Sequence, residues 1–265
     1  MYRTAVLAGL TVLSGCSTHP ITGREQILAL PALQAAHAET RFALTTGVQR
    51  IAAALPCMQD CGEAERLAAF ARRTAAIGAM LEAAARDKAP DLFERIKGFQ
   101  IEVNDNLGIG TGSSAGGRIA LGAGLAGLEP TDTVLAFLIA REMAHVIARH
   151  AEEDSGASLV FSVLGMLLLP GFSLILRTLA TTLGSSVLKS SWAADQLREA
   201  DEIAVALLQR TGTPALHIAL ALETGLKRTL LPDDEWGAGY LDSTQRVVMI
   251  AVNGASPPTY TASGN

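Results

Sequence analysis

One segment constrains the fold more than any other part of this sequence. Residues 131–153 repeat apolar side chains at the spacing of one helix face, and a Thr-Asp pair at the start can supply the N-cap. The segment also carries Arg141, Glu142 and His145. A helix places positions 141 and 145 one above the other, with Glu142 beside them. The sequence therefore predicts a long apolar helix that presents one cluster of polar side chains.

The composition favours packed helices and excludes several classes of protein. Hydrophobic residues make up 49% of the 265 residues, charged residues 18% and aromatic residues only 5%, and the net charge is −5. The chain is too apolar to be disordered, and its negative charge argues against a general nucleic-acid binder. Three cysteines exclude a disulfide-dense small scaffold and a four-cysteine zinc site. We expect a helical protein that works near a membrane and binds no nucleic acid.

The N-terminus resembles a bacterial lipoprotein signal. A basic residue precedes an apolar run too short for a lasting bilayer span, and Leu13-Ser14-Gly15-Cys16 resembles the lipobox, in which the cysteine is lipidated. We therefore expect a signal peptide over 1–15 and a lipidated tether over 16–30 that holds the protein at a membrane. Ser17 stands where an inner-membrane retention signal often has Asp, so the resemblance implies the outer membrane, facing the periplasm. An ordinary signal peptide or a short buried helix is the alternative.

Two further cysteines fit an oxidising compartment. Cys57 and Cys61 lie four residues apart between two alanine-rich helical patterns. In the periplasm they can close a small loop as a disulfide. Two free thiols or a metal-binding pair are the other interpretations.

The remaining pattern predicts an α+β protein that is predominantly helical. Helical spacing covers about 31–55, 63–87 and 192–211. Alternating residues near 99–121 predict strands, and the glycines among them indicate a hairpin or edge-strand turn, because no phosphate-binding Gly-Lys-Ser/Thr follows. We expect a small antiparallel sheet beside the 131–153 helix. The domain should cover 31–252, followed by a disordered tail over 253–265.

A second apolar segment raises the question of membrane insertion. Ser155 to Leu176 contains no charged residue, as a membrane span would require, but Pro170-Gly171 interrupts it. We expect two buried or membrane-dipping helices here, with a true span as the alternative.

The polar cluster has the spacing of a zinc-protease site. In the His-Glu-x-x-His pattern, two imidazoles at i and i+4 hold the metal, and the adjacent Glu takes a proton from the attacking water. A third ligand, often a Glu, comes from a later helix. Here Arg198-Glu199-Ala200-Asp201 lies on such a helix.

These pieces together resemble a known family. The matching parts are the lipobox with Pro20-Ile-Thr-Gly-Arg24, the glycine-rich strand before the helix, Glu142 to His150, and the Glu199 helix. In this order they resemble the zinc metallopeptidases of the HtpX and CAAX prenyl protease family, specifically the periplasmic lipoprotein branch. The resemblance implies a gluzincin-like fold, zinc ligands at His145 and Glu199, and Glu142 as general base. It also implies that the glycine-rich strand pairs with extended substrate.

The sequence departs from this family at the first metal ligand. Arg141 stands where the first histidine belongs, and a guanidinium stays protonated and offers only donors. At about 4 Å it would repel a dication by roughly 8 kcal/mol for an effective dielectric near 20. On a continuous helix His150 faces away from His145, and His217 would need a tertiary coincidence to replace the missing ligand.

Two further departures from the family's pattern also indicate that the metal site has changed. The C-terminal stretch 239–246 lacks the histidine that the family commonly carries there, and Ala204 stands where the family tends to have Gly. We predict that Arg141 pairs with Glu199, Glu142 or both, so that a salt-bridge network replaces zinc. Otherwise the Glu199 helix presents an exposed acidic face, or His145 is an ordinary core histidine.

The sequence thus supports one leading function and two alternatives. The leading hypothesis is a catalytically degenerate, membrane-anchored metallopeptidase homologue that binds polypeptide in envelope protein quality control or outer-membrane assembly, with zinc weak or absent. The first alternative is an active zinc metalloendopeptidase that recruits an unconventional ligand. The second is a structural lipoprotein that docks to membrane or partner through the apolar 155–190 hairpin.

Overall fold

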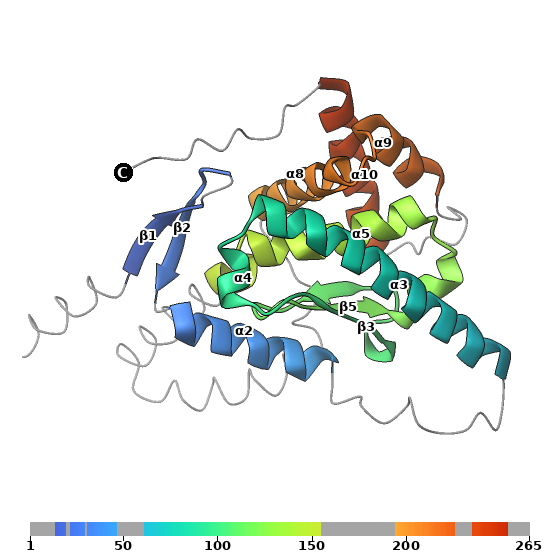
Figure 1. The fold of residues 1–265 in the computed structure, drawn as a ribbon, viewed down its shortest axis with the longest axis horizontal. Helices are drawn as coiled ribbons and strands as arrows, with labels where there is room; N and C mark the ends of the chain where they lie inside the picture. The colour runs from blue at the N-terminus through green and yellow to red at the C-terminus, as the bar shows by residue number, and fades with distance from the viewer. Residues whose placement is uncertain are drawn as a thin grey trace, which may run out of the picture.

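The computed structural model describes residues 14–19, 22–29, 31–46, 61–154, 194–225 and 235–253. Its helices are α2 (Pro31–Thr46), α3 (Cys61–Lys88), α4 (Leu92–Arg95), α5 (Asp132–Ile147), α8 (Ala194–Arg210), α9 (Ala215–Thr224) and α10 (Glu235–Asn253). Two 3-10 segments, η2 (Asp105–Leu107) and η3 (Ala123–Leu128), flank the central strands. The chain is mostly helical with a small sheet packed against helices, which confirms the expected fold class (Figure 1).

The central sheet is mixed. Its strands are β3 (Gln100–Asn104), β4 (Thr111–Ser113) and β5 (Arg118–Gly122), in the order β3-β5-β4. β4 and β5 form the expected antiparallel hairpin, but β3 pairs with β5 in parallel. The expectation of a wholly antiparallel sheet was therefore wrong. The chain reverses direction between β3 and β4, so that β5 inserts between them. In the glycine-rich stretch, the structure confirms the interpretation as a hairpin turn.

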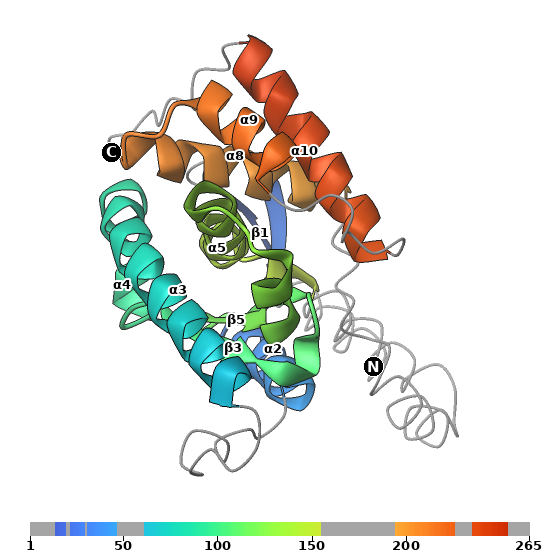
Figure 2. The same ribbon diagram turned by 90° about the vertical axis from the view of Figure 1, so that its right-hand side faces the viewer.

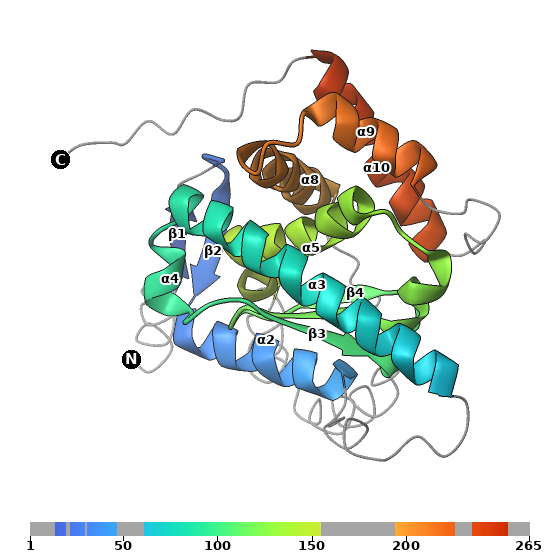
Figure 3. The same ribbon diagram turned by 45° about the vertical axis from the view of Figure 1, so that its right-hand side comes forward.

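The long helix expected from the sequence is the centre of the protein. Figure 2 shows α5 surrounded by α3, α8 and the sheet, and Figure 3 shows α2 on the opposite side of the sheet. The apolar side chains of α5 are almost fully buried, with Leu135, Ile139 and Met143 at 0% exposure. Ala144 on α5 and Ala204 on α8 are also fully buried, and their small size lets the two helices pack closely. This packing brings the polar side chains of α5 and α8 to one place.

The N-terminal part forms a hairpin that the sequence pattern did not reveal. β1 (Ser14–Thr18) and β2 (Glu25–Ala29) pair antiparallel, with Cys16 opposite Ile27. The turn closes with a bond from the His19 amide to the Arg24 carbonyl at 2.8 Å, and Gly23 adopts a φ of 72° that favours glycine. The hairpin thus begins in the last two residues of the expected signal peptide and otherwise lies in the segment expected to be the tether.

Several expectations concern parts of the chain outside the described residues. Among these are the apolar segment 155–176, the tail 254–265 and Cys57, so the disulfide with Cys61 stays a prediction. The domain boundaries stay predictions as well. In the part of the chain that the structure describes, no helix is both long and apolar enough to cross a bilayer.

Candidate functional site

The site forms where the C-terminal half of α5 faces the N-terminal half of α8. Thr131 caps α5, because its hydroxyl accepts the amide of Val134 at 3.4 Å. Glu142 and His145 on α5 and Glu199 and Asp201 on α8 are all at least 95% buried. The alternative of an exposed acidic face on α8 therefore does not hold for these two carboxylates.

Arg141 turns toward this site, but its partner differs from the expected one. Its Nε lies 3.1 Å from Oδ1 of Asp201, an ion-pair distance, although the two groups are not aligned as a hydrogen bond. Asp201 is fully buried and also accepts Nε of Arg246 at 2.6 Å and the Ser243 hydroxyl at 2.7 Å. The prediction that Arg141 pairs with Glu199 or Glu142 was wrong. Asp201 lies two positions beyond Glu199 on α8. The Glu199 carboxylate already accepts hydrogen bonds from other side chains.

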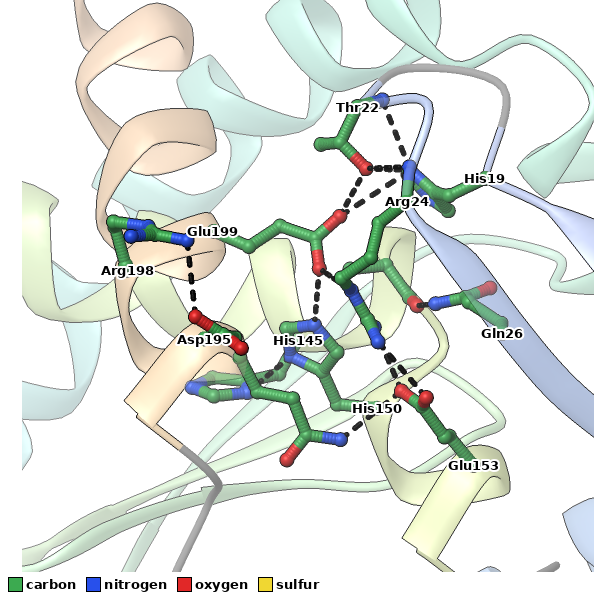
Figure 4. A network of polar contacts seen from close by, with 12 residues as sticks. His19, Thr22, Arg24, Gln26, His145, His150, Glu153, Asp195, Arg198 and Glu199 are labelled. Carbon is green, nitrogen blue, oxygen red and sulfur yellow. Dashed lines mark hydrogen bonds and ion pairs between the residues drawn. The ribbon is translucent and has the colours of Figure 1, made fainter.

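Three side chains donate to Glu199 (Figure 4). His150 lies 3.0 Å from Oε2 through Nε2, Arg24 donates its Nε to Oε2 at 2.6 Å, and the Thr22 hydroxyl donates to Oε1. Burial raises the pKa of Glu199, but the hydrogen bonds from these donors outweigh that effect and hold the pKa at about 2. Glu199 is therefore ionised, and both of its carboxylate oxygens accept hydrogen bonds.

His150 does not face away from His145, as a continuous helix would require. Nδ1 of His145 and Nδ1 of His150 are 2.8 Å apart, and the rings meet edge to face. α5 ends at Ile147, and Arg149 adopts a left-handed φ of 60°, which turns the chain back before residues 150–154 become helical again. The expectation for His150 was wrong because it assumed an unbroken helix. Burial, then His150 and Arg141, lower the pKa of His145 well below its usual 6.5.

Glu142 faces the central sheet. Its Oε1 accepts the hydroxyl of Thr111 on β4 at 2.6 Å, and its side chain is 5% exposed. Burial raises the pKa of Glu142 above its usual 4.5, against the opposing effect of Thr111 and Arg141. Thr111 is a site residue that the sequence analysis did not single out, because a threonine in a glycine-rich strand carries no local signal.

The N-terminal hairpin completes the site. Nε2 of His19 lies 3.0 Å from the carbonyl of Ile147, and the Gln26 amide donates to the carbonyl of Ala148 at 2.5 Å. These bonds satisfy carbonyl groups at the C-terminal end of α5. Residues 20–24 were noted in the sequence only for their family resemblance. That Thr22 and Arg24 bond to Glu199 was not predicted. The two polar side chains of this motif, Thr22 and Arg24, were the signal that could have revealed it.

A comparison with sequence models of protein families identifies the family of this chain. The sequence model of Peptidase family M48 matches residues 107–243, more than half of the chain. The chain belongs to Peptidase family M48. The match covers β4, β5, α5 and α8, and so includes Glu142, His145 and Glu199. A search of curated proteins found no match.

M48 peptidases typically use zinc, so the site can be tested for its fit to that ion. Within the described ranges, no group of three or more His, Cys, Asp or Glu side chains is arranged to hold a metal ion. The reason lies in the neighbouring cations. Arg141 stands at the helical position of the first ligand, and the Arg24 guanidinium already binds Glu199. A dication here would have to displace one cation and approach another. The residues as arranged do not fit zinc.

Proposed function

We propose that this chain is a membrane-anchored periplasmic M48 homologue that has lost zinc hydrolysis and binds polypeptide in envelope protein quality control. The observation that carries the proposal is Arg141, a permanent cation at a ligand position, paired with a buried carboxylate. Because Asp201 pairs with Arg141, the contact between α5 and α8 does not depend on a metal. Glu142, His145 and Glu199 are then remnants of the general base and the zinc ligands.

An unpaired strand edge supports the polypeptide-binding role. β4 lies at one end of the β3-β5-β4 order, and no other described strand pairs with its outer edge. An extended polypeptide can add to such an edge through backbone hydrogen bonds. Since Thr111 of β4 bonds to Glu142, a polypeptide on this edge would lie beside the remnant site.

The lipobox-like Leu13-Ser14-Gly15-Cys16 supports the membrane anchor, and Ser17 supports the outer membrane. Lipidation at Cys16 would place the anchor within β1, three residues before His19. The protein would then work close to the periplasmic surface of the outer membrane, with a membrane-assembly client or another envelope polypeptide as partner.

One observation favours a second function, an active zinc metalloendopeptidase with an unconventional ligand. The His150 ring lies within hydrogen-bond distance of both His145 and Glu199, so an extra imidazole is available beside the remnant ligands. This function would require Arg24 to leave Glu199.

The deciding experiment measures zinc content and casein hydrolysis for the natural protein, Arg141→His, and Arg141→His combined with Arg24→Ala. We expect neither zinc nor hydrolysis in the natural protein. The single variant should gain little zinc because Arg24 still occupies Glu199, whereas the double variant should bind zinc, with Asp201 orienting the new imidazole. Near-stoichiometric zinc together with casein cleavage in the natural protein would overturn the proposal and establish the second function.

A second measurement tests binding itself. Fluorescence anisotropy with reduced, alkylated casein should show saturable binding to the natural protein. No binding of this unfolded polypeptide at any protein concentration up to solubility would contradict the polypeptide-binding role.

A further inference from the structure

The guanidinium of Arg24 makes the contacts that the side chain of a bound arginine ligand would make. Its Nε donates to Glu199, while its two terminal nitrogens donate to the two oxygens of Glu153 at 2.8 and 2.7 Å (Figure 4). Paired contacts of this kind match the planar fork of a guanidinium and cannot be reproduced by the single ammonium of lysine. The geometry is that of an arginine-binding site.

The rest of the site is built to receive this group. Glu199 and Glu153 come from different segments, α8 and residues 150–154, and each has a further donor that fixes its orientation. His150 lies 3.0 Å from Glu199, and Gln196 donates to Glu153 at 3.1 Å. The Glu199 side chain is only 5% exposed and that of Glu153 20%. Two ionised carboxylates this close to each other and to the protein interior require a cation between them.

Arg24 reaches the site from a hairpin that is separate from the central sheet. β1 and β2 pair only with each other among the described strands, and Figure 1 shows them beside the helical body rather than within it. An isolated two-stranded hairpin is at best marginally stable in water. Its polar attachments to α5 and α8 are the side chains of the turn and of early β2, namely His19, Thr22, Arg24 and Gln26. These contacts are hydrogen bonds and ion pairs, which the polar groups of a bound polypeptide can replace.

We propose that Glu199 and Glu153 form a binding site for an arginine side chain, which Arg24 fills as an internal ligand and which an arginine of a bound polypeptide fills when the β1–β2 hairpin is displaced. The hairpin thus occupies the arginine site with a side chain that mimics the ligand. The second half of this proposal rests on the proposed polypeptide-binding function, whereas the first half stands on the contacts of Arg24 alone.

The first experiment tests the guanidinium site by chemical rescue. Arg24→Ala leaves both carboxylates without their cation, so its melting temperature should fall below that of the natural protein. Ethylguanidinium at millimolar concentration, with EDTA present, should raise it again by about 2–4 °C, because a ligand that binds only the folded state stabilises that state. Ethylammonium should produce less than half of this shift.

Arg86→Ala is the matched control, since it frees a single carboxylate, Glu82, whose side chain is 23% exposed, from a similar arginine contact. Its melting temperature should not respond to ethylguanidinium. Equal responses of the two variants, or equal effects of ethylguanidinium and ethylammonium on Arg24→Ala, would overturn the proposal. A larger shift with zinc chloride, in samples without EDTA, would also overturn it in favour of a metal site.

The second experiment uses a labelled alanine-based pentapeptide with one central arginine and its lysine counterpart. The arginine peptide should bind Arg24→Ala about 10-fold more tightly than the natural protein, and the lysine peptide should show no such gain. Adding Glu199→Gln should abolish the gain. If Arg24→Ala does not fold, Arg24→Lys retains a cation on Glu199, and the arginine peptide should displace this weaker internal ligand.

The outcomes separate this inference from the proposed function. If the natural protein binds reduced casein but Arg24→Ala does not distinguish the two peptides, the function stands and the arginine site fails. If ethylguanidinium rescues Arg24→Ala while no form binds either casein or the arginine peptide, the internal contact stands and both the polypeptide-binding function and the external ligand fail.

Discussion

Arg141 on α5 and Asp201 on α8 form an ion pair inside the protein, with Nε 3.1 Å from Oδ1 and the aspartate fully buried. The pair joins the two helices that carry the candidate site. A long, permanently charged side chain at position 141 can reach a carboxylate that also accepts Arg246 and Ser243. The positive charge of Arg141, which would repel a metal ion, thus links α5 to α8.

Replacing Asp201 should strongly destabilise the protein. Asp201→Asn removes the buried anion that Arg141 faces and one of the two carboxylates that pair with Arg246, which keeps Asp242, so we expect a loss of about 3 kcal/mol in the free energy of unfolding. Urea denaturation measures this loss. The control on the same helix is Asp195→Asn, which removes an exposed ion pair with Arg198 and should cost less than about 0.5 kcal/mol. Similar losses for the two variants would show that the buried pair is not a structural link.

The pH dependence of stability should report the contacts of Glu199. The pKa of Glu199 is about 2 in the folded protein, below its usual 4.5, because His150, Thr22 and Arg24 bind the ionised form despite its burial. Its contribution is therefore complete above about pH 4.5 and is lost as the pH falls toward 2. After allowance for solvent screening, we expect this contribution to be on the order of 2 kcal/mol.

Urea denaturation at several pH values between 5 and 2 measures this effect. Glu199→Gln removes the titrating group but keeps the shape of the side chain, so its stability should fall less steeply over this range. Parallel pH profiles of the two proteins would contradict the assigned contacts.

His145 should remain neutral in mildly acidic solution. Burial, the neighbouring His150 and the positive charge of Arg141 all lower its pKa. Nitrogen-15 NMR of the imidazole should therefore show a neutral ring for His145 from pH 7 down to 5.5. Arg141→Met removes one of these causes and should move the protonation of His145 to higher pH. A titration of His145 near its usual 6.5 in the natural protein would mean that the site is open to water.

The end of β5 should not tolerate a side chain at Gly122. A Cβ there would collide with the backbone carbonyl of Gly108, whereas a Cβ at Gly112 on β4 would meet nothing within 4 Å. Because a backbone atom cannot move aside cheaply, Gly122→Ala should lower the free energy of unfolding by about 3 kcal/mol. Gly112→Ala is the matched control and should be close to neutral. Chemical denaturation compares the two.

The sequence by itself determined several of the helices and the polar cluster on α5. Periodicity within one segment fixes which face of a helix is apolar, and on that basis α3 and α8 were predicted where they occur and α5 was predicted with its start but not its break after Ile147. The same local geometry placed Arg141, Glu142 and His145 on one helix, and the glycine-rich stretch correctly indicated a hairpin between β4 and β5. Such features depend on residues only a few positions apart.

Only the tertiary structure decided which charged side chains form ion pairs. Arg24 and Glu199 are 175 positions apart, and no local pattern shows that the N-terminal hairpin reaches α8. The left-handed residue Arg149 brings His150 back to His145, which a continuous helix would prevent. With Glu199 already engaged, Arg141 pairs with Asp201 instead. Periodicity describes one element at a time, whereas ion pairing depends on how separate elements pack and on which of several carboxylates is still available.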